Sequence, residues 1–118
     1  MSVWIMLSTA GSVREANRMA EKLVSEKLAA CVTVLPGAIS HFFWEGKLSR
    51  EKEAVIIAKT TRANAGKMIN KIKEIHRYEV PEILFFRAGR GEKTYLDWVK
   101  KSLANKKEKN IDSSCQKR

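Results

Sequence analysis

The chain has 118 residues and a mass of 13.4 kDa, which is the size of one domain. Its 44% hydrophobic and 31% charged residues indicate neither a disordered chain nor a membrane protein. The apolar runs are far shorter than the roughly 20 residues of a membrane-spanning helix, no secretory-signal pattern surrounds the first run, and two cysteines cannot form a disulfide scaffold. We therefore expect a cytoplasmic protein with no membrane partner.

The net charge of +10 comes from 23 basic and 13 acidic residues. Residues 105–118 carry five basic and two acidic groups, or +3, which leaves +7 for residues 1–104. This polar C-terminal segment lacks apolar periodicity, so we predict one domain over residues 1–104 and a disordered basic tail over 105–118. Cys115 in the tail is interpreted as a stray thiol. The basic body suggests polyanion partners, although a solvated surface that keeps the protein soluble explains it more simply.

The first elements are a strand and a helix. Residues 3–8 form a β-rich run that Thr9-Ala10-Gly11 ends. Ser12 and Glu15 then form a capping box, which predicts a helix from about residue 13 to residue 27. Its apolar stripe is expected to include Val13, Ala16, Ala20, Leu23 and Val24.

A long β-hairpin is predicted next. Residues 30–35 alternate as a strand, with Val32 and Val34 on one side. Pro36-Gly37 interrupts the strand, and glycine tolerates a bulge at such a point. Extended character resumes over residues 39–44, a turn follows at residues 45–47, and residues 52–60 form the returning strand.

The second half predicts a helix, a strand and a final helix. Thr60 or Thr61 is the expected cap of a helix with an apolar stripe at Ala65, Met68, Ile69, Ile72 and Ile75. Residues 83–87 form the last strand, in which the aromatic pair Phe85-Phe86 suggests a central position. Thr94 and Asp97 are read as a capping box for a helix up to residue 103. The order β-α-β-β-α-β-α predicts an α+β, ferredoxin-like sandwich with an extended hairpin and a C-terminal helix.

The hairpin is too long for its own domain. A compact body of about 104 residues has a diameter of roughly 33 Å, whereas residues 30–44 would extend over about 50 Å. The hairpin must either bend back over its own domain or project and expose Phe42, Phe43 and Trp44 to water. Monomers rarely expose so much apolar surface. We favour the second arrangement with other subunits covering the hairpin, and we expect an oligomer whose interface includes these three rings.

The sequence resembles the CutA family of divalent-cation tolerance proteins. The resemblance extends over roughly residues 3–103 and rests on blocks in family order: Leu28-Ala29-Ala30-Cys31-Val32, Leu35-Pro36-Gly37, Trp44-Glu45-Gly46-Lys47, Lys59-Thr60, His76, Tyr78-Glu79-Val80-Pro81-Glu82-Ile83 and Tyr95-Leu96-Asp97-Trp98. It implies a ferredoxin-like subunit in a homotrimer and a non-enzymatic protein linked to tolerance of, and response to, copper and other divalent metal ions. The architecture is also similar to that of PII-like signalling trimers, which bind small ligands in clefts between subunits.

Three positions depart from the family pattern. Arg77 stands where the family usually has proline. Ser8 stands where some members carry a cysteine, and Ile75 where those members carry a second histidine. A copper site built from that cysteine and histidine pair would keep only His76 here.

The candidate metal ligands are His76 and Cys31. Imidazole suits copper and zinc, and a thiolate favours Cu(I) or zinc, but one ligand does not make a selective site. A cleft histidine and a small buried hydrophobic cysteine are the structural alternatives, and we favour them. Copper or another divalent metal ion stays the candidate cofactor, with further ligands from neighbouring subunits.

The candidate cleft residues are Tyr78, Glu79 and Glu82, with Lys47 and Lys59 as opposite charges. Functional residues are often carried on loops that a rigid scaffold holds in place. Interfacial ion pairing or backbone hydrogen bonding of the two glutamates is the simpler explanation, and ligand binding is the alternative.

Two other functions compete with divalent-cation tolerance. One is small-ligand signalling of the PII type, and the other is a basic ferredoxin-like module that binds nucleic acid. RNA-binding sheets of this kind stack bases on aromatic residues of a characteristic strand motif, which the sequence lacks. We therefore expect no nucleic-acid partner.

Overall fold

The computed structural model describes residues 2–104, so the predicted basic tail (105–118) and Cys115 lie outside the described residues. The elements are β1 (Val3–Ala10), α1 (Val13–Ser25), β2 (Cys31–Trp44), β3 (Lys47–Thr61), the short 3-10 helix η1 (Arg62–Asn64), α2 (Ala65–Ile75), β4 (Ile83–Arg87) and α3 (Lys93–Ala104). Their order confirms the prediction. The hairpin strands continue to the turn, so β3 begins earlier than expected.

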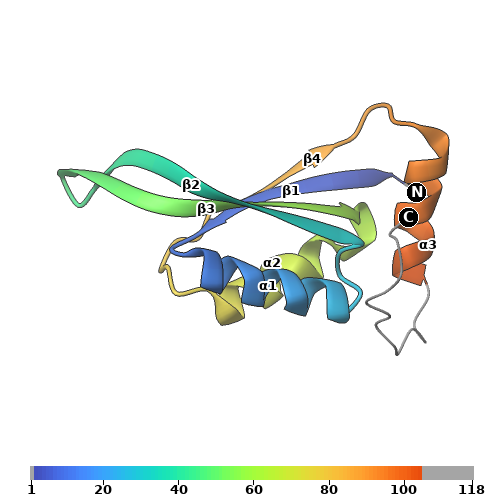
Figure 1. The fold of residues 1–118 in the computed structure, drawn as a ribbon, viewed down its shortest axis with the longest axis horizontal. Helices are drawn as coiled ribbons and strands as arrows, with labels where there is room; N and C mark the ends of the chain where they lie inside the picture. The colour runs from blue at the N-terminus through green and yellow to red at the C-terminus, as the bar shows by residue number, and fades with distance from the viewer. Residues whose placement is uncertain (1, 105–118) are drawn as a thin grey trace.

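The strands form one antiparallel sheet in the order β2-β3-β1-β4. Helices α1 and α2 cover one face of the sheet, and α3 lies at the end away from the hairpin (Figure 1). The predicted ferredoxin-like α+β fold is therefore confirmed. The prediction that Phe85 and Phe86 lie in a central strand is wrong, because β4 is an edge strand that pairs only with β1.

The core lies between the sheet and the two covering helices. Met6 and Ile56 from the sheet meet Leu23 from α1 and Met68 and Ile72 from α2, and all five are fully buried. The predicted stripe of α1 is partly wrong. Ala16, Met19 and Leu23 are its buried residues, whereas Val13 and Val24 are exposed. No helix within residues 2–104 is long and apolar enough to cross a membrane.

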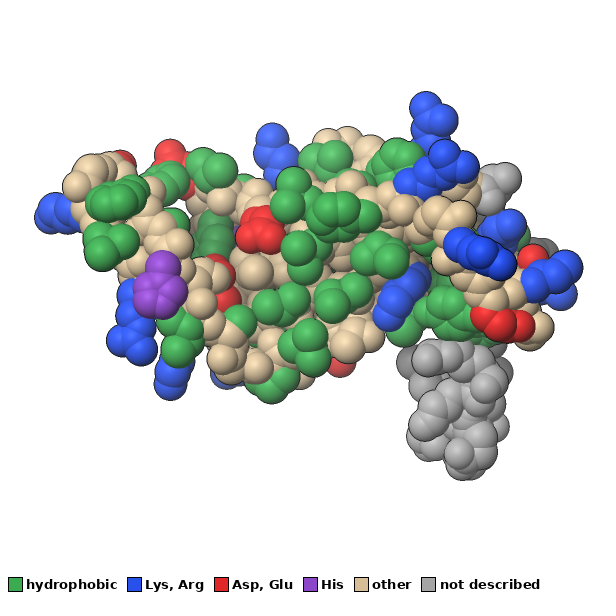
Figure 2. Space-filling view, turned by 90° about the horizontal axis from the view of Figure 1, so that it is seen from above, with side chains coloured by type: hydrophobic (Ala, Val, Ile, Leu, Met, Phe, Trp, Pro, Cys, Tyr) green, Lys and Arg blue, Asp and Glu red, His purple; other side chains and the backbone are tan. Residues whose placement is uncertain are grey.

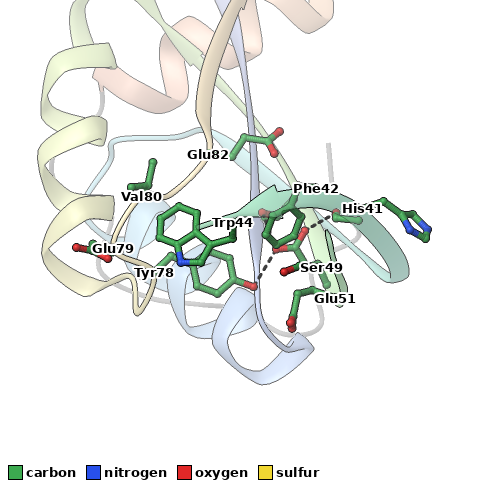
Figure 3. Close-up of a pocket in the computed structure, with 12 residues that line it drawn as sticks. His41, Phe42, Trp44, Ser49, Glu51, Tyr78, Glu79, Val80 and Glu82 are labelled. Atoms are coloured by element: carbon green, nitrogen blue, oxygen red, sulfur yellow. Dashed lines mark hydrogen bonds between the residues drawn. The ribbon is translucent and has the colours of Figure 1, made fainter. Parts of the chain in front are cut away.

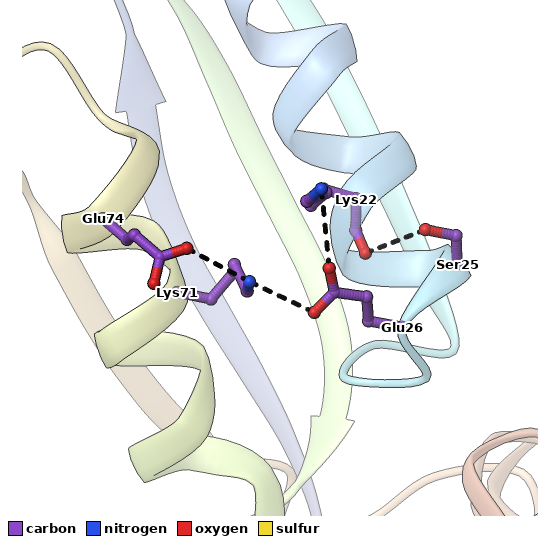
Figure 4. A network of polar contacts seen from close by, with 5 residues as sticks. All are labelled: Lys22, Ser25, Glu26, Lys71 and Glu74. Atoms are coloured by element: carbon purple, nitrogen blue, oxygen red, sulfur yellow. Dashed lines mark hydrogen bonds and ion pairs between the residues drawn. The ribbon is translucent and has the colours of Figure 1, made fainter.

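Ion pairs join the exposed sides of α1 and α2 (Figure 4). The Lys71 ammonium lies 3.4 Å from a Glu26 carboxylate oxygen and 3.3 Å from one of Glu74, and Glu26 also pairs with Lys22 at 3.7 Å. Hydrogen bonds to Glu74 and then Glu26 raise the pKa of Lys71. Because these groups lie near solvent, they align the two helices but add little stability compared with the core.

The helix ends confirm one predicted cap and correct two. The Ser12 hydroxyl accepts the Glu15 N–H at 3.1 Å, as predicted. Thr60 caps no helix; its hydroxyl donates to the Leu28 carbonyl at 2.6 Å, and Thr61 precedes η1 without a side-chain cap.

At α3 the side chain of Glu92 replaces the predicted Thr94–Asp97 box. Its carboxylate accepts the N–H groups of Thr94 and Tyr95 at 3.1 and 2.8 Å, and these bonds lower the pKa of Glu92. Asp97 instead pairs with Lys93 at 2.9 Å.

The β2–β3 hairpin projects from the body (Figure 1), and the molecule measures 46 × 31 × 24 Å. Glu45 and Gly46 both have positive φ, 51° and 79°, which is typical of a type I′ turn between two strands. The hairpin therefore extends away from the domain, as favoured from the sequence.

A β-bulge at Pro36-Gly37 changes the sides of β2. The pairing with β3 shifts by one residue between Leu35 and Ala38. A one-residue shift reverses the side that the following residues face. Val32 and Val34 thus pack toward the helix-covered core, whereas Phe42 and Trp44 face the opposite side of the sheet.

That opposite side, which we call the open face, is covered by no helix of residues 2–104 (Figure 1). Figure 2 looks onto it and shows apolar side chains over much of the sheet. Leu84 and Phe86 of β4 are half-exposed at one edge of this face, and Leu35 of β2 is half-exposed at the opposite edge. Phe42 and Trp44 of the hairpin face the same side of the sheet.

We predict that Ile72→Ala lowers the free energy of unfolding by about 2–5 kcal/mol, because Ile72 is 0% exposed in the core. The control Ile69→Ala changes the same residue type on the same helix, where the side chain is 36% exposed, and should lose less than about 1 kcal/mol. Urea unfolding at one protein concentration measures both. Equal losses would contradict the assignment of the buried side of α2.

Candidate functional site

A cavity of about 830 Å³ lies between the hairpin and the connection from α2 to β4, residues 76–82. Figure 3 shows side chains from both segments converging on it, with the His41 ring directed away. The lining residues are Thr9, Ser40, His41, Phe42, Trp44, Ser49, Glu51, Glu53, Tyr78, Glu79, Val80 and Glu82. The hairpin thus supplies one wall and the 76–82 connection the other.

Glu53 is the polar centre of this site. Its carboxylate is 8% exposed and accepts hydrogen bonds from three hydroxyls: Ser40 at 2.5 Å, Tyr78 at 2.8 Å and Thr9 at 3.4 Å. These donors come from β2, the 76–82 connection and β1. One buried carboxylate therefore fixes the positions of three segments that are distant in the sequence.

The 76–82 connection is fastened to β1 at two further points. His76 Nδ1 accepts the Tyr78 N–H at 3.0 Å, so in the neutral ring the proton lies on Nε2, which donates to the Thr9 carbonyl at 2.7 Å. The Ser8 hydroxyl donates to the Glu82 carbonyl at 2.7 Å. Arg77, at the position where the family usually has proline, forms an ion pair with Glu15 at 3.2 Å.

The Tyr78 hydroxyl is held in its neutral, hydrogen-bonding form. Burial, and then the hydrogen bond to the Glu53 carboxylate, raises the pKa of Tyr78 above its ordinary value. The nearby charges of Glu51 and Glu15 act in the same direction. Tyr78 thus stays a donor to Glu53 over the physiological pH range.

The structure brings together only some of the predicted cleft residues. Tyr78, Glu79 and Glu82 line the cavity. Lys47 does not line it, because it lies next to the hairpin turn. Lys59 lies in the sheet beside β2, where its ammonium donates to the Thr33 hydroxyl at 3.4 Å.

The three hairpin aromatics divide between two sides. Phe42 and Trp44 line the cavity and are 39% and 43% exposed. Phe43 faces the other side, where it pairs with Leu48, and both are more than two-thirds exposed. A single chain therefore leaves both sides of the hairpin in water.

The two predicted metal ligands lie in different environments. Both ring nitrogens of His76 have backbone partners, so coordination of a metal would require one of these bonds to open. Cys31 is a half-buried free thiol in β2, opposite Lys59. Within residues 2–104 no group of three or more His, Cys, Asp or Glu side chains could hold a metal ion. The metal assignment stays a prediction.

Sequence reasoning missed Glu53, Glu51 and Ser40. In the sequence, Glu53 is one charge in a run of charges before a strand, and no local pattern marks it as buried. Its signal is the pairing of β3 with β2, which places Glu53 opposite Ala38 and Glu51 opposite Ser40. That pairing depends on the bulge.

The geometry defines a ferredoxin-like domain with a projecting hairpin, an uncovered apolar sheet face and an acidic, aromatic cavity. The sequence profile of the family described as CutA1 divalent ion tolerance protein matches residues 4–102. The divalent-cation tolerance protein CutA of Salmonella newport is 42% identical over 99 residues, which are 84% of this chain and 86% of that protein. The chain belongs to the CutA1 divalent ion tolerance family.

Solved structures agree with this assignment. CutA1 from Oryza sativa superposes with a TM-score of 0.85 at 33% identity, covering 86% of this chain and 94% of that one. The periplasmic divalent cation tolerance protein CutA from Archaeoglobus fulgidus gives a TM-score of 0.83 at 36% identity, covering 86% and 98%.

We predict that Tyr78→Phe lowers the free energy of unfolding by about 1–3 kcal/mol at neutral pH, because the buried Glu53 loses a donor. Wild-type stability should fall as pH rises above about 10, since the unfolded chain releases the Tyr78 proton before the folded one does.

Denaturant unfolding between pH 7 and pH 11 tests both points. The difference in the free energy of unfolding between wild type and Tyr78→Phe should become smaller at high pH. Tyr95→Phe keeps Tyr78, so its stability should still fall at alkaline pH. A difference in the free energy of unfolding that does not change with pH would contradict the raised pKa of Tyr78.

Proposed function

We propose that the protein is a homotrimer of the divalent-cation tolerance type, non-enzymatic, that takes part in the response to metal ions. The observation that carries the trimer is the exposed apolar surface of the open face together with the exposed rings of Phe42 and Trp44 on the hairpin. Water contact with a surface of this size is unfavourable, and monomers rarely tolerate it.

A closed ring fits the shape of the subunit. The hairpin projects at one end of the sheet (Figure 1), so in an assembly it would contact a region of the neighbouring copy other than that copy's own hairpin. Such a head-to-tail contact closes into a ring when its rotation allows. The resemblance to CutA supplies the number three, and the unpaired edges of β2 and β4 supply strands that can pair between subunits.

We propose weak binding of divalent metal ions at or near the clefts between subunits. His76 and Cys31 are the ligand candidates, copper and zinc the candidate ions. Ligands from neighbouring copies would have to complete such a site, because residues 2–104 of one chain offer no group of three.

We also propose that the protein is non-enzymatic and cytoplasmic. Both ring nitrogens of His76 are hydrogen-bonded to backbone groups, and the His41 ring points away from the cavity (Figure 3), which supports a non-enzymatic role. The cytoplasm stays our expected location, while one solved relative is described as periplasmic.

A second candidate function is the binding of a small ligand, as in PII-like trimers. The cavity between the hairpin and residues 76–82 favours it, because its side chains come from several segments and leave space for a small molecule. Nucleic-acid binding gains no such support, since the aromatic pair Phe85-Phe86 lies on an edge strand.

We predict a mass of about 40 kDa by light scattering at micromolar concentration, three times the 13.4 kDa of one chain. Trp44→Ala should shift the dissociation midpoint to at least about tenfold higher concentration, because it removes part of the covered surface. The control Val24→Ala changes an exposed residue of α1, on the other side of the sheet from the open face (Figure 1), and should leave assembly unchanged. A folded monomer for the wild type would exclude the trimer.

We predict that titration with Cu(II) or Zn(II) releases or absorbs heat that His76→Ala reduces. His41→Ala, an exposed histidine of the hairpin, is the control and should leave the isotherm unchanged. Circular dichroism checks that His76→Ala stays folded after losing its two backbone contacts. An isotherm unchanged by His76→Ala would exclude His76 as a ligand.

A further inference from the structure

The cavity combines acidic and aromatic side chains and has no lysine or arginine in its lining. Four carboxylates, those of Glu51, Glu53, Glu79 and Glu82, belong to it. The rings of Phe42, Trp44 and Tyr78 complete its apolar part (Figure 3). The acidic lining of the cavity contrasts with the chain as a whole, whose net charge is +10.

These carboxylates differ from several others in the protein. Glu15, Glu26, Glu74 and Asp97 each pair with a lysine or arginine. Among residues 2–104, no ion pair joins any of the four cavity glutamates to a basic group, although Arg50 and Lys52 belong to the same hairpin. Arg50 pairs with His41 and Lys52 with Ile39, on the side of the hairpin away from Phe42.

Glu53 is the buried member of these four carboxylates. It is more than nine-tenths buried, yet in the described part of the chain its only partners are neutral hydroxyls. A buried carboxylate without a counter-charge is unfavourable, and a cation in the adjoining cavity would stabilise it. The negative potential at the back of the cavity therefore selects for positive charge.

The aromatic rings favour an organic cation over a metal ion. The faces of tryptophan, tyrosine and phenylalanine attract cations through their quadrupoles but offer no ligand atom to a metal ion. No metal-binding group of three acidic, histidine or cysteine side chains occurs in residues 2–104. An alkylated or primary ammonium group on a small organic body satisfies both the rings and the carboxylates.

We propose that this cavity binds a small organic ammonium ion, with Trp44, Phe42 and Tyr78 contacting its apolar part and Glu51 and Glu82 balancing its charge. The proposal names the ligand class for the small-ligand function given above. One chain supplies all the residues that line the cavity, and two of them, Phe42 and Trp44, also belong to the surface that the proposed trimer covers.

The test is calorimetric titration of the full-length protein with three probes of similar size. Choline carries a quaternary ammonium, ethanolamine a primary ammonium, and 3,3-dimethylbutan-1-ol is the neutral isostere of choline. Choline binding that exceeds ethanolamine binding would indicate recognition through the rings, and the reverse order would indicate hydrogen bonding to the carboxylates; either supports an ammonium site. The neutral alcohol should bind at least about tenfold more weakly than choline.

Two conservative variants locate the site. Glu51→Gln and Glu82→Gln change exposed side chains, keep their size, and should each weaken binding of the ammonium probe about fivefold. Glu21→Gln, an exposed glutamate of α1 outside the cavity, is the matched control and should bind as the wild type does.

Three results would overturn the proposal: no binding of either ammonium probe, equal binding of the neutral alcohol, or equal effects of Glu51→Gln, Glu82→Gln and Glu21→Gln. Zn(II) binding that depends on Glu51 and Glu82 while both ammonium probes fail to bind would also overturn it and assign the cavity to a metal. Light scattering on the same samples keeps the two proposals separate. A trimer that binds no ammonium contradicts only the ligand class, and a monomer that binds one contradicts only the trimer.

Discussion

The structure around the cavity depends on the carboxylate of Glu53. Hydroxyls from β1, β2 and the 76–82 connection all donate to it, so one buried carboxylate joins the hairpin to two other segments. Each donor is satisfied only when the other segments are in place. The same group places a buried negative charge beside the cavity, and its hydrogen bond, after burial, raises the pKa of Tyr78. Glu53 therefore affects both the shape of the cavity and its charge.

Around this point the molecule separates two kinds of surface. The helix-covered face buries a conventional core, and its exposed helices carry ion pairs that add little to stability. The open face and the aromatic side of the hairpin remain apolar and uncovered in a single chain. The cavity lies where these surfaces meet the 76–82 connection. The proposed assembly and the proposed ligand class therefore concern the same side of the molecule.

Local sequence patterns were sufficient for the fold but insufficient for the site. Alternation, the Ser12 cap and the Pro36-Gly37 interruption each depend on neighbouring residues, and the structure confirms them. The Thr94–Asp97 cap failed because Glu92 competes for the same N–H groups from one position before the helix. The role of Glu53 could not be predicted, because its three donors lie 13 to 44 residues away. The resemblance to CutA supplied Tyr78, Glu79 and Glu82, which do line the cavity.

The bulge at Pro36-Gly37 has a genetic consequence. Two residues there stand opposite one residue of β3, so loss of a single codon would remove the bulge while Ala38 to Trp44 kept their partners and their sides. What would change is the bend and the added twist that a bulge gives its strand. An in-frame deletion at this point would thus redirect the hairpin and leave the chemistry of each of its sides untouched.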